Sequence, residues 1–133
     1  MMEIAGIDHI VLRTTQLDAM LAFYCQVLGC ELERQTSPEA GLTQLRAGNA
    51  MIDLVTLDSN LGKAGGPAPA LTGRNLDHFC LQLKPVSEVE IIDHLQRHGI
   101  DVDAFALRYG ALGQKRTLYI SDPDGNRVEL VSL

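Results

Sequence analysis

Two histidines occupy equivalent places in two similar stretches of the chain. The stretches are IDHIVLRT (7–14) and LDHFCLQL (76–83), and each has an Asp-His pair followed by residues that alternate as in a β-strand. Imidazole is a frequent ligand of divalent transition metals. A single histidine in a strand is more often a hydrogen-bonded structural residue, but two in register indicate a functional pair. We therefore take His9 and His78 as candidate metal ligands.

A carboxylate stands in the last strand-like stretch of each half. Asp53 lies in MIDLVTL (51–57) and Glu129 in RVELVSL (127–133), each between apolar neighbours. An ionised carboxylate in such surroundings is costly when it is buried without a cation. Two imidazoles with one or two carboxylates suit Zn²⁺, Ni²⁺, Mn²⁺, Fe²⁺ or Co²⁺. The sequence therefore predicts one divalent metal ion, with both histidines, Glu129 and, as a fourth candidate, Asp53 as its ligands.

Strand alternation indicates which side chains share a face with these ligands. Arg13 shares a face with His9, whereas Ile10 and Leu12 lie on the opposite face, which we expect a helix to cover. Arg13 and Tyr119 are the candidates for contact with a substrate.

A helix is expected after each histidine-bearing strand. Residues 16–29 have apolar side chains at helical spacing, with Thr15 as the expected cap. Residues 87–99 begin with Ser87 and Glu90, which form the S-x-x-E pattern of a capping box. The expected apolar face of this second helix consists of Val89, Ile92 and Leu95. The stripe that we interpret as solvent-exposed rather than metal-binding consists of Glu90, His94 and His98.

Three strand-like stretches follow each expected helix, which makes each half a β-α-β-β-β module. They are 31–36, 42–47 and 50–57 in the first half and 101–108, 115–121 and 127–133 in the second. We expect a single α+β domain (1–133) that consists of module 1 (about 4–57), a linker (58–75) and module 2 (about 76–133). The linker is rich in Gly, Pro and Ala. This composition is consistent with a plain connector and equally with a lid over a cavity.

The composition is that of one soluble globular domain. The chain has 133 residues, of which 46% are hydrophobic, and a net charge of −6. This charge argues against a nucleic acid or an anionic membrane surface as partner, and no stretch approaches the ~18 apolar residues of a membrane span. No signal peptide is apparent, so we expect a cytoplasmic protein. Cys25, Cys30 and Cys80 are then expected to be buried, reduced thiols.

Four motifs resemble the vicinal oxygen chelate superfamily, which includes glyoxalases, bleomycin-resistance proteins and extradiol dioxygenases. They are GIDHIVLRT, AFYCQVLGCEL, LDHFCLQL and ISDPDGNRVELV, and the resemblance covers the chain apart from the linker. It implies a glyoxalase-like fold, in which two tandem βαβββ modules form a curved, partly closed mixed sheet around a central cavity with a divalent metal ion. It also implies a homodimer that binds a small-molecule substrate.

The resemblance further implies roles for individual residues. The family's metal ligands correspond to His9, His78 and Glu129, and glyoxalase-like members have Glu or Gln where this chain has the shorter Asp53. The shared chemistry is chelation of a substrate through two neighbouring oxygens, with Glu129 as first candidate for moving a proton and Asp53 as second. We therefore expect a metal-dependent lyase or isomerase of the glyoxalase type. A non-catalytic small-molecule or antibiotic-binding resistance protein, a metal-dependent dioxygenase and a thiol transferase stay open as alternatives.

Overall fold

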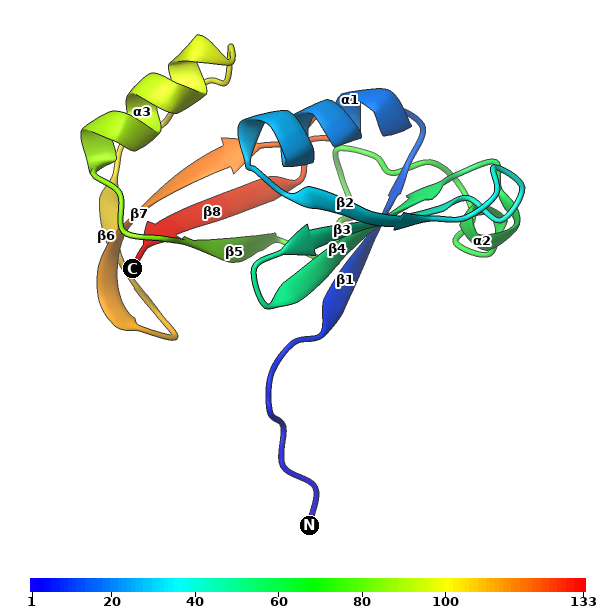
Figure 1. Ribbon diagram of the computed structural model, residues 1–133, viewed down its shortest axis with the longest axis horizontal. Helices are drawn as coiled ribbons and strands as arrows, with labels where there is room; N and C mark the ends of the chain where they lie inside the picture. Colours follow the sequence, from blue (N-terminus) through cyan, green and yellow to red (C-terminus); the bar gives the residue numbers. More distant parts are fainter. The chain divides into compact units, whose positions relative to one another are not determined.

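The chain repeats one order of elements in two units (Figure 1). A computed structural model describes residues 1–133 and divides them into unit 1 (Met1–Ala70) and unit 2 (Leu71–Leu133). Each unit has a strand, a helical segment and three further strands, and its four strands form one open, mixed sheet. The expected α+β class with two βαβββ modules is therefore confirmed.

Unit 1 has its strands in the order β1-β4-β3-β2. They are β1 (His9–Thr14), β2 (Glu31–Gln35), β3 (Leu42–Ala47) and β4 (Ala50–Thr56). β1 pairs in parallel with β4, and the other pairs are antiparallel. Gly48 and Asn49 connect β3 to β4 in a two-residue turn, where Gly48 has a φ of 63°. The strands expected in the first half are thus confirmed to within two residues.

The helical segment of unit 1 has two parts. α1 (Leu17–Leu21) is α-helical, and η1 (Ala22–Val27) continues it as a π-helix. The buried side chains of this segment are Met20, Phe23 and Tyr24. The expected cap at Thr15 is wrong, because the helix begins one residue too late for it. The cap position is Gln16, which makes no capping bond with its side chain.

Unit 2 repeats this arrangement in the order β5-β8-β7-β6. Its strands are β5 (His78–Leu83), β6 (Ala106–Gly110), β7 (Gly113–Ser121) and β8 (Arg127–Ser132). β5 pairs in parallel with β8, and the other pairs are antiparallel. The first strand of each unit therefore lies beside its last strand, which places the histidine and the carboxylate of one unit on neighbouring strands.

α3 (Glu88–Arg97) is the helix of unit 2, and its start confirms the predicted capping box. The Ser87 hydroxyl accepts from the Glu90 N–H, and the Glu90 carboxylate accepts from the Ser87 N–H. The predicted apolar face is wrong at Val89, which is 76% exposed, whereas Ile91 and Leu95 are buried. Helix residues turn by about 100° each, so Val89 lies about 200° away from Ile91.

β6 is shorter than the strand predicted over 101–108. It begins at Ala106, and residues 101–105 have no regular structure. Asp101 and Asp103 are exposed there, and aspartate is a poor strand former. Because the pairing with β7 starts at Ala106 opposite Thr117, β7 continues without a neighbour on that side.

The predicted linker contains a short helix, α2 (Asn60–Lys63). The Ser59 hydroxyl caps it by accepting from the Gly62 N–H. Residues 64–75 have no helix or strand. Part of this segment is therefore structured, which the composition alone did not indicate.

Buried apolar side chains alternate along the strands of each unit. Leu12 is 7% exposed and its neighbour Val11 is 50% exposed, as the predicted faces of β1 require. The largest fully buried apolar side chains on strands are Leu45 and Leu54 in unit 1 and Leu118, Val128 and Leu130 in unit 2. None of the helices is both long and apolar enough to cross a membrane.

Candidate functional site

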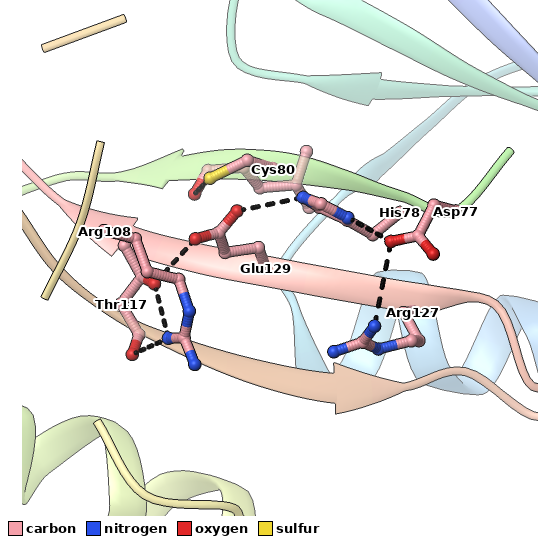
Figure 2. A network of polar contacts seen from close by, with 8 residues as sticks. Asp77, His78, Cys80, Arg108, Thr117, Arg127 and Glu129 are labelled. Atoms are coloured by element: carbon pink, nitrogen blue, oxygen red, sulfur yellow. Dashed lines mark hydrogen bonds and ion pairs between the residues drawn. The ribbon is translucent and has the colours of Figure 1, made fainter. Parts of the chain in front are cut away.

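His78 and Glu129 form the central pair of a network of polar contacts in unit 2 (Figure 2). β5 and β8 run in parallel, with Cys80 opposite Glu129, so His78 is one step along the same face. Nε2 of His78 lies 3.3 Å from Oε2 of Glu129. Glu129 is 8% exposed, so its carboxylate is largely shielded from water. The structure therefore brings together two of the four predicted ligands.

Asp77 contacts the other nitrogen of the same imidazole. Its Oδ2 lies 2.7 Å from Nδ1 of His78, and Nη1 of Arg127 lies 3.7 Å from that oxygen. The hydrogen bond to His78 and, to a smaller degree, the charge of Arg127 hold the pKa of Asp77 below its usual value. A carboxylate at Nδ1 favours the tautomer with its proton there, which leaves Nε2 free as a ligand atom.

Thr117 fixes the second oxygen of Glu129. Its hydroxyl donates to Oε1 over 2.6 Å, and it is 4% exposed. Arg108 donates from Nη1 to the hydroxyl and the carbonyl oxygen of Thr117, over 2.8 and 2.9 Å. The Glu129 carboxylate is thus held at Oε1, while Oε2 faces His78 (Figure 2).

Tyr119, one of the two predicted substrate residues, lies in the same cluster. Its ring meets the His78 ring edge-on, with 5.1 Å between the centroids. The guanidinium carbons of Arg108 and Arg127 lie 4.4 and 4.2 Å from the Tyr119 centroid. These cation–π contacts bring positive charge close to the His78–Glu129 pair.

Cys80 is exposed, which contradicts the expectation that all three thiols are buried. Strand alternation explains the difference, because Cys80 shares the polar face of β5 with His78 rather than the apolar face. Partial burial of its thiol and the neighbouring Glu129 carboxylate raise the pKa of Cys80 to about 11. Cys30 is buried as expected, and Cys25 is partly exposed.

Unit 1 contains the corresponding histidine and carboxylate. Nδ1 of His9 contacts Oδ1 of Asp8, and this hydrogen bond raises the pKa of His9. Asp53 is 3% exposed and accepts from Nε2 of Gln44 at Oδ2, over 3.2 Å. Its other oxygen, Oδ1, is buried and has no hydrogen-bond partner. A buried carboxylate oxygen without a donor is costly, and a cation would relieve that cost.

Both units therefore offer donors that fit a divalent metal. Two ligand atoms at about 2.0–2.2 Å from a tetrahedral zinc ion lie about 3.3 Å apart. Nε2 of His78 and Oε2 of Glu129 are separated by the same distance, 3.3 Å. The unpartnered Oδ1 of Asp53 points to the same requirement for a cation. Within either unit alone, no three His, Cys, Asp or Glu side chains form a group that could hold a metal ion. The four-ligand set of His9, His78, Glu129 and Asp53 stays a prediction.

Arg13, the other predicted substrate residue, has its guanidinium engaged within unit 1. It donates to the carbonyl oxygens of Gly62, Gly66 and Pro67. A Cβ on Gly65 would lie 2.2 Å from Nε of Arg13, so this segment packs closely on the guanidinium. These contacts fasten the 62–67 segment to β1, and a role of Arg13 toward a substrate stays a prediction.

Several residues of the site were missed from the sequence. The repeated Asp-His pair does point to Asp8 and Asp77, although only its histidines were predicted as site residues. Thr117, Arg108 and Gln44 contact the candidate site across neighbouring strands. No local motif marks them, because cross-strand contacts depend on register.

Comparisons with known proteins agree with this fold. Catechol-2,3-dioxygenase of Bacillus subtilis (strain 168) is 32% identical over 129 residues, which are 96% of this chain, and the chain spans 41% of that protein's length. Virulence protein STM3117 of Salmonella typhimurium is 29% identical over 131 residues, 97% of this chain and 85% of that protein. The crystal structure of lactoylglutathione lyase from Agrobacterium tumefaciens has a TM-score of 0.70 at 26% identity, covering 98% of this chain and 95% of that one. The sequence model of a single superfamily matches residues 6–130, and the chain belongs to that family, the Glyoxalase/Bleomycin resistance protein/Dioxygenase superfamily.

Proposed function

We propose that this protein is a divalent-metal-dependent lyase or isomerase that acts on a small molecule offering two neighbouring oxygens. The observation that carries the proposal is the contact of His78 Nε2 with Glu129 Oε2 at 3.3 Å. Asp77 orients the imidazole and Thr117 holds the carboxylate, so both donors are fixed before any cation arrives. The proposal extends this pair to His9 and, as fourth ligand, Asp53.

A metal ion held by these residues would act as a Lewis acid on substrate oxygens. Zn²⁺, Ni²⁺, Mn²⁺, Fe²⁺ and Co²⁺ all suit a set of two imidazoles and carboxylates. The buried Oδ1 of Asp53 favours a place for that residue in the set, since it has no other partner.

Glu129 is the residue that we assign to proton movement. Its Oε1 accepts a hydrogen bond from Thr117, so Oε2 is the oxygen available to take or give a proton. Shielding from water strengthens each electrostatic contact of this carboxylate. Tyr119, whose ring adjoins His78, is the residue that we place beside the substrate, with Arg13 as the second candidate.

A dioxygenase is the second candidate function. The Bacillus relative at 32% identity is named for that activity, although this chain spans 41% of its length. A thiol transferase and a non-catalytic resistance protein that binds a small molecule or antibiotic remain as further alternatives. A binding protein needs no metal, so metal content separates it from the enzymes.

The test is metal analysis of purified protein beside two variants, His78→Ala and Glu129→Ala. We expect about one divalent ion per chain in the native protein and loss of that ion in both variants. His94→Ala is the matched control, because His94 is an exposed histidine on α3. A native protein that binds no divalent metal would contradict every enzyme reading. With metal present, oxygen uptake would indicate a dioxygenase, and turnover of a methylglyoxal–thiol adduct would indicate the glyoxalase type.

The proposal also covers the oligomeric state and the cellular location of the protein. We propose that modules 4–57 and 76–133, joined by the 58–75 linker, work as one domain in a cytoplasmic homodimer. The measured mass of the purified protein by light scattering checks the dimer, since one chain has a mass of 14.5 kDa.

A further inference from the structure

β7 has an unpaired edge over its last residues. β6, the edge strand of its sheet, pairs with β7 only between Ala106–Gly110 and Gly113–Thr117 (Figure 1). No backbone hydrogen bond joins residues 100–105 to the rest of β7. The other side of β7 is occupied over these last residues, because β8 pairs with Thr117–Ser121.

The register identifies the backbone groups on this open edge. The Asp122 N–H donates to the Asn126 carbonyl oxygen over 2.9 Å, toward the β8 side. Hydrogen-bonded and non-hydrogen-bonded pairs alternate along an antiparallel ladder. The N–H and C=O groups of Tyr119 and Ser121 therefore point away from β8, toward the side that β6 does not reach.

A cleft lies along this edge. Its volume is about 500 Å³, and all of its lining belongs to unit 2. One wall is the segment Gly99–Asp103 between α3 and β6, and the other consists of Tyr119, Ile120, Ser121 and Arg127. Clefts of about 300–1,000 Å³ are of the size that binds small molecules.

The lining combines groups of opposite hydrogen-bonding character. Arg127 supplies a guanidinium whose side chain is 48% exposed and whose one ion pair, with Asp77, is long at 3.7 Å. Its donors and the N–H groups of Tyr119 and Ser121 match a carboxylate. Asp101 and Asp103 on the facing wall carry carboxylate oxygens, of which Oδ1 of Asp103 accepts from the Ala104 N–H. Together with the free strand carbonyls, these oxygens match a hydroxyl or an ammonium group.

We propose that this cleft binds a small carboxylic acid that also carries a hydroxyl or ammonium group. The carboxylate is held by Arg127 and by the N–H of Ser121, which lies opposite Arg127 in the β7–β8 ladder. The N–H of Tyr119, about 7 Å further along the strand edge, lines the cleft beside it. The donor group lies toward Asp101 and Asp103, which disfavour a second anion on that wall. None of these residues is a proposed metal ligand, and Tyr119 lines this cleft with its backbone rather than with the ring that adjoins His78. The site therefore goes beyond the proposed function and is testable without metal.

An extended peptide could in principle use the same open strand edge. The facing wall Gly99–Asp103 bounds the cleft on its far side, and the charged groups match the two ends of one small molecule. The small acid is therefore the occupant that we infer, and binding of peptide alone is an outcome that contradicts it.

The test is an NMR titration of the full-length, metal-free protein with lactate, alanine, propionate and ethanolamine. We expect shifts at the amides of Tyr119 and Ser121 with lactate or alanine. Propionate lacks the donor group and ethanolamine lacks the carboxylate, so each should bind at least about fivefold more weakly. Equal affinity for propionate, shifts with an extended tripeptide amide only, or no shifts at these amides would overturn the proposal.

Two variants test the assigned donors. Arg127→Gln should weaken lactate binding about tenfold, since it removes a charge-assisted contact. Ser121→Pro deletes only the N–H that faces the cleft and spares the β7–β8 ladder, whereas Ser121→Ala keeps that N–H. Weakening in Ser121→Pro with retention in Ser121→Ala supports the backbone contact. Unchanged affinity for lactate in both Arg127→Gln and Ser121→Pro overturns the proposed carboxylate site. A protein that binds lactate but no metal would refute the proposed function and leave this site standing.

Discussion

Oδ2 of Asp77 lies 2.7 Å from Nδ1 of His78, and Asp8 makes the same contact with His9 in unit 1. In both units an aspartate directly precedes the histidine at the start of a strand. The carboxylate holds Nδ1, so Nε2 is the nitrogen left for a cation. The repeated Asp-His pair thus orients an imidazole in the same way in both units.

Replacing Asp77 with alanine should weaken metal binding. Loss of a carboxylate behind a metal-ligating histidine typically costs roughly 10–100-fold in affinity. In the metal-free protein the same change should move the His78 proton toward Nε2, which ¹⁵N shifts of the ring report. Asp93→Ala is the control, because Asp93 pairs only with Arg97 on the surface of α3. An unchanged tautomer and an unchanged affinity would together contradict the orienting role.

Thr117→Val should destabilise the protein by about 1–3 kcal/mol, because it leaves Oε1 of the shielded Glu129 without its donor. Valine has nearly the shape of threonine, so what is lost is the hydroxyl's two hydrogen bonds, to Glu129 and from Arg108, rather than packing. Urea unfolding of metal-free protein measures the difference. Thr117→Ser keeps the hydroxyl and should recover most of the stability; equal stability of the valine and native proteins would mean that this contact contributes little.

The strands that carry the site were predictable because their signals are local. Alternation along β1 and β8 and the two-residue turn at Gly48 specify strands without reference to the rest of the chain. The face of α3 was misjudged because Val89, Ile91 and Ile92 are all apolar, and only tertiary packing selects Ile91. The shortening of β6 also depends on tertiary context, since pairing with β7 had to compete with the exposure of Asp101 and Asp103.

In the candidate site, the ligand-type residues could be predicted from the sequence, whereas the contacts that support them could not. His78 and Glu129 were predicted as metal ligands from their chemistry and their register between modules, and the structure places them 3.3 Å apart. Thr117 on β7 contacts Glu129, and Arg108 on β6 contacts Thr117. A shift of one residue in either register would turn them to the other face. Such contacts require the assembled sheet.

Arg13→Lys should loosen the 62–67 segment. Lysine keeps the positive charge but lacks the planar fork that donates to Gly62, Gly66 and Pro67 together. Hydrogen exchange of the amides in this segment should become faster, with little change in the strands of unit 1. Arg46→Lys, which alters an exposed pair with Glu33, is the control and should leave the segment unaffected. Slow exchange in both variants would show that the segment is held by other contacts.

The capping box of α3 should make stability depend on pH in acid. Ser87→Ala should cost about 1 kcal/mol at pH 7, the usual effect of losing a helix cap. Hydrogen bonds from the side chain and backbone of Ser87 lower the pKa of Glu90 below its ordinary 4.5. A lowered folded-state pKa stabilises the fold above pH 4.5, and this contribution disappears as the pH falls through the folded value. Thermal unfolding of native protein and Glu90→Gln should therefore differ at pH 7 and converge as the pH falls through the lowered pKa of Glu90; a constant difference would contradict the linkage.

Cys80 should react slowly with iodoacetamide although it is exposed. Its pKa of about 11 exceeds the ordinary 9.0 by about two units, which lowers the thiolate fraction at pH 8 roughly a hundredfold. A more basic thiolate is also more nucleophilic, by up to about tenfold over this range, so the net rate should be about tenfold below that of a model cysteine. Site-resolved mass spectrometry of metal-free protein measures the rate at Cys80 alone.

Glu129→Gln removes the negative charge beside the thiol and should accelerate labelling. The rate of the native protein should keep rising above pH 9, where the rate of an ordinary thiol levels off. Rapid labelling of the native protein at pH 8 would contradict the raised pKa of Cys80, and equal rates in native protein and Glu129→Gln would mean that the Glu129 carboxylate does not act on this sulfur.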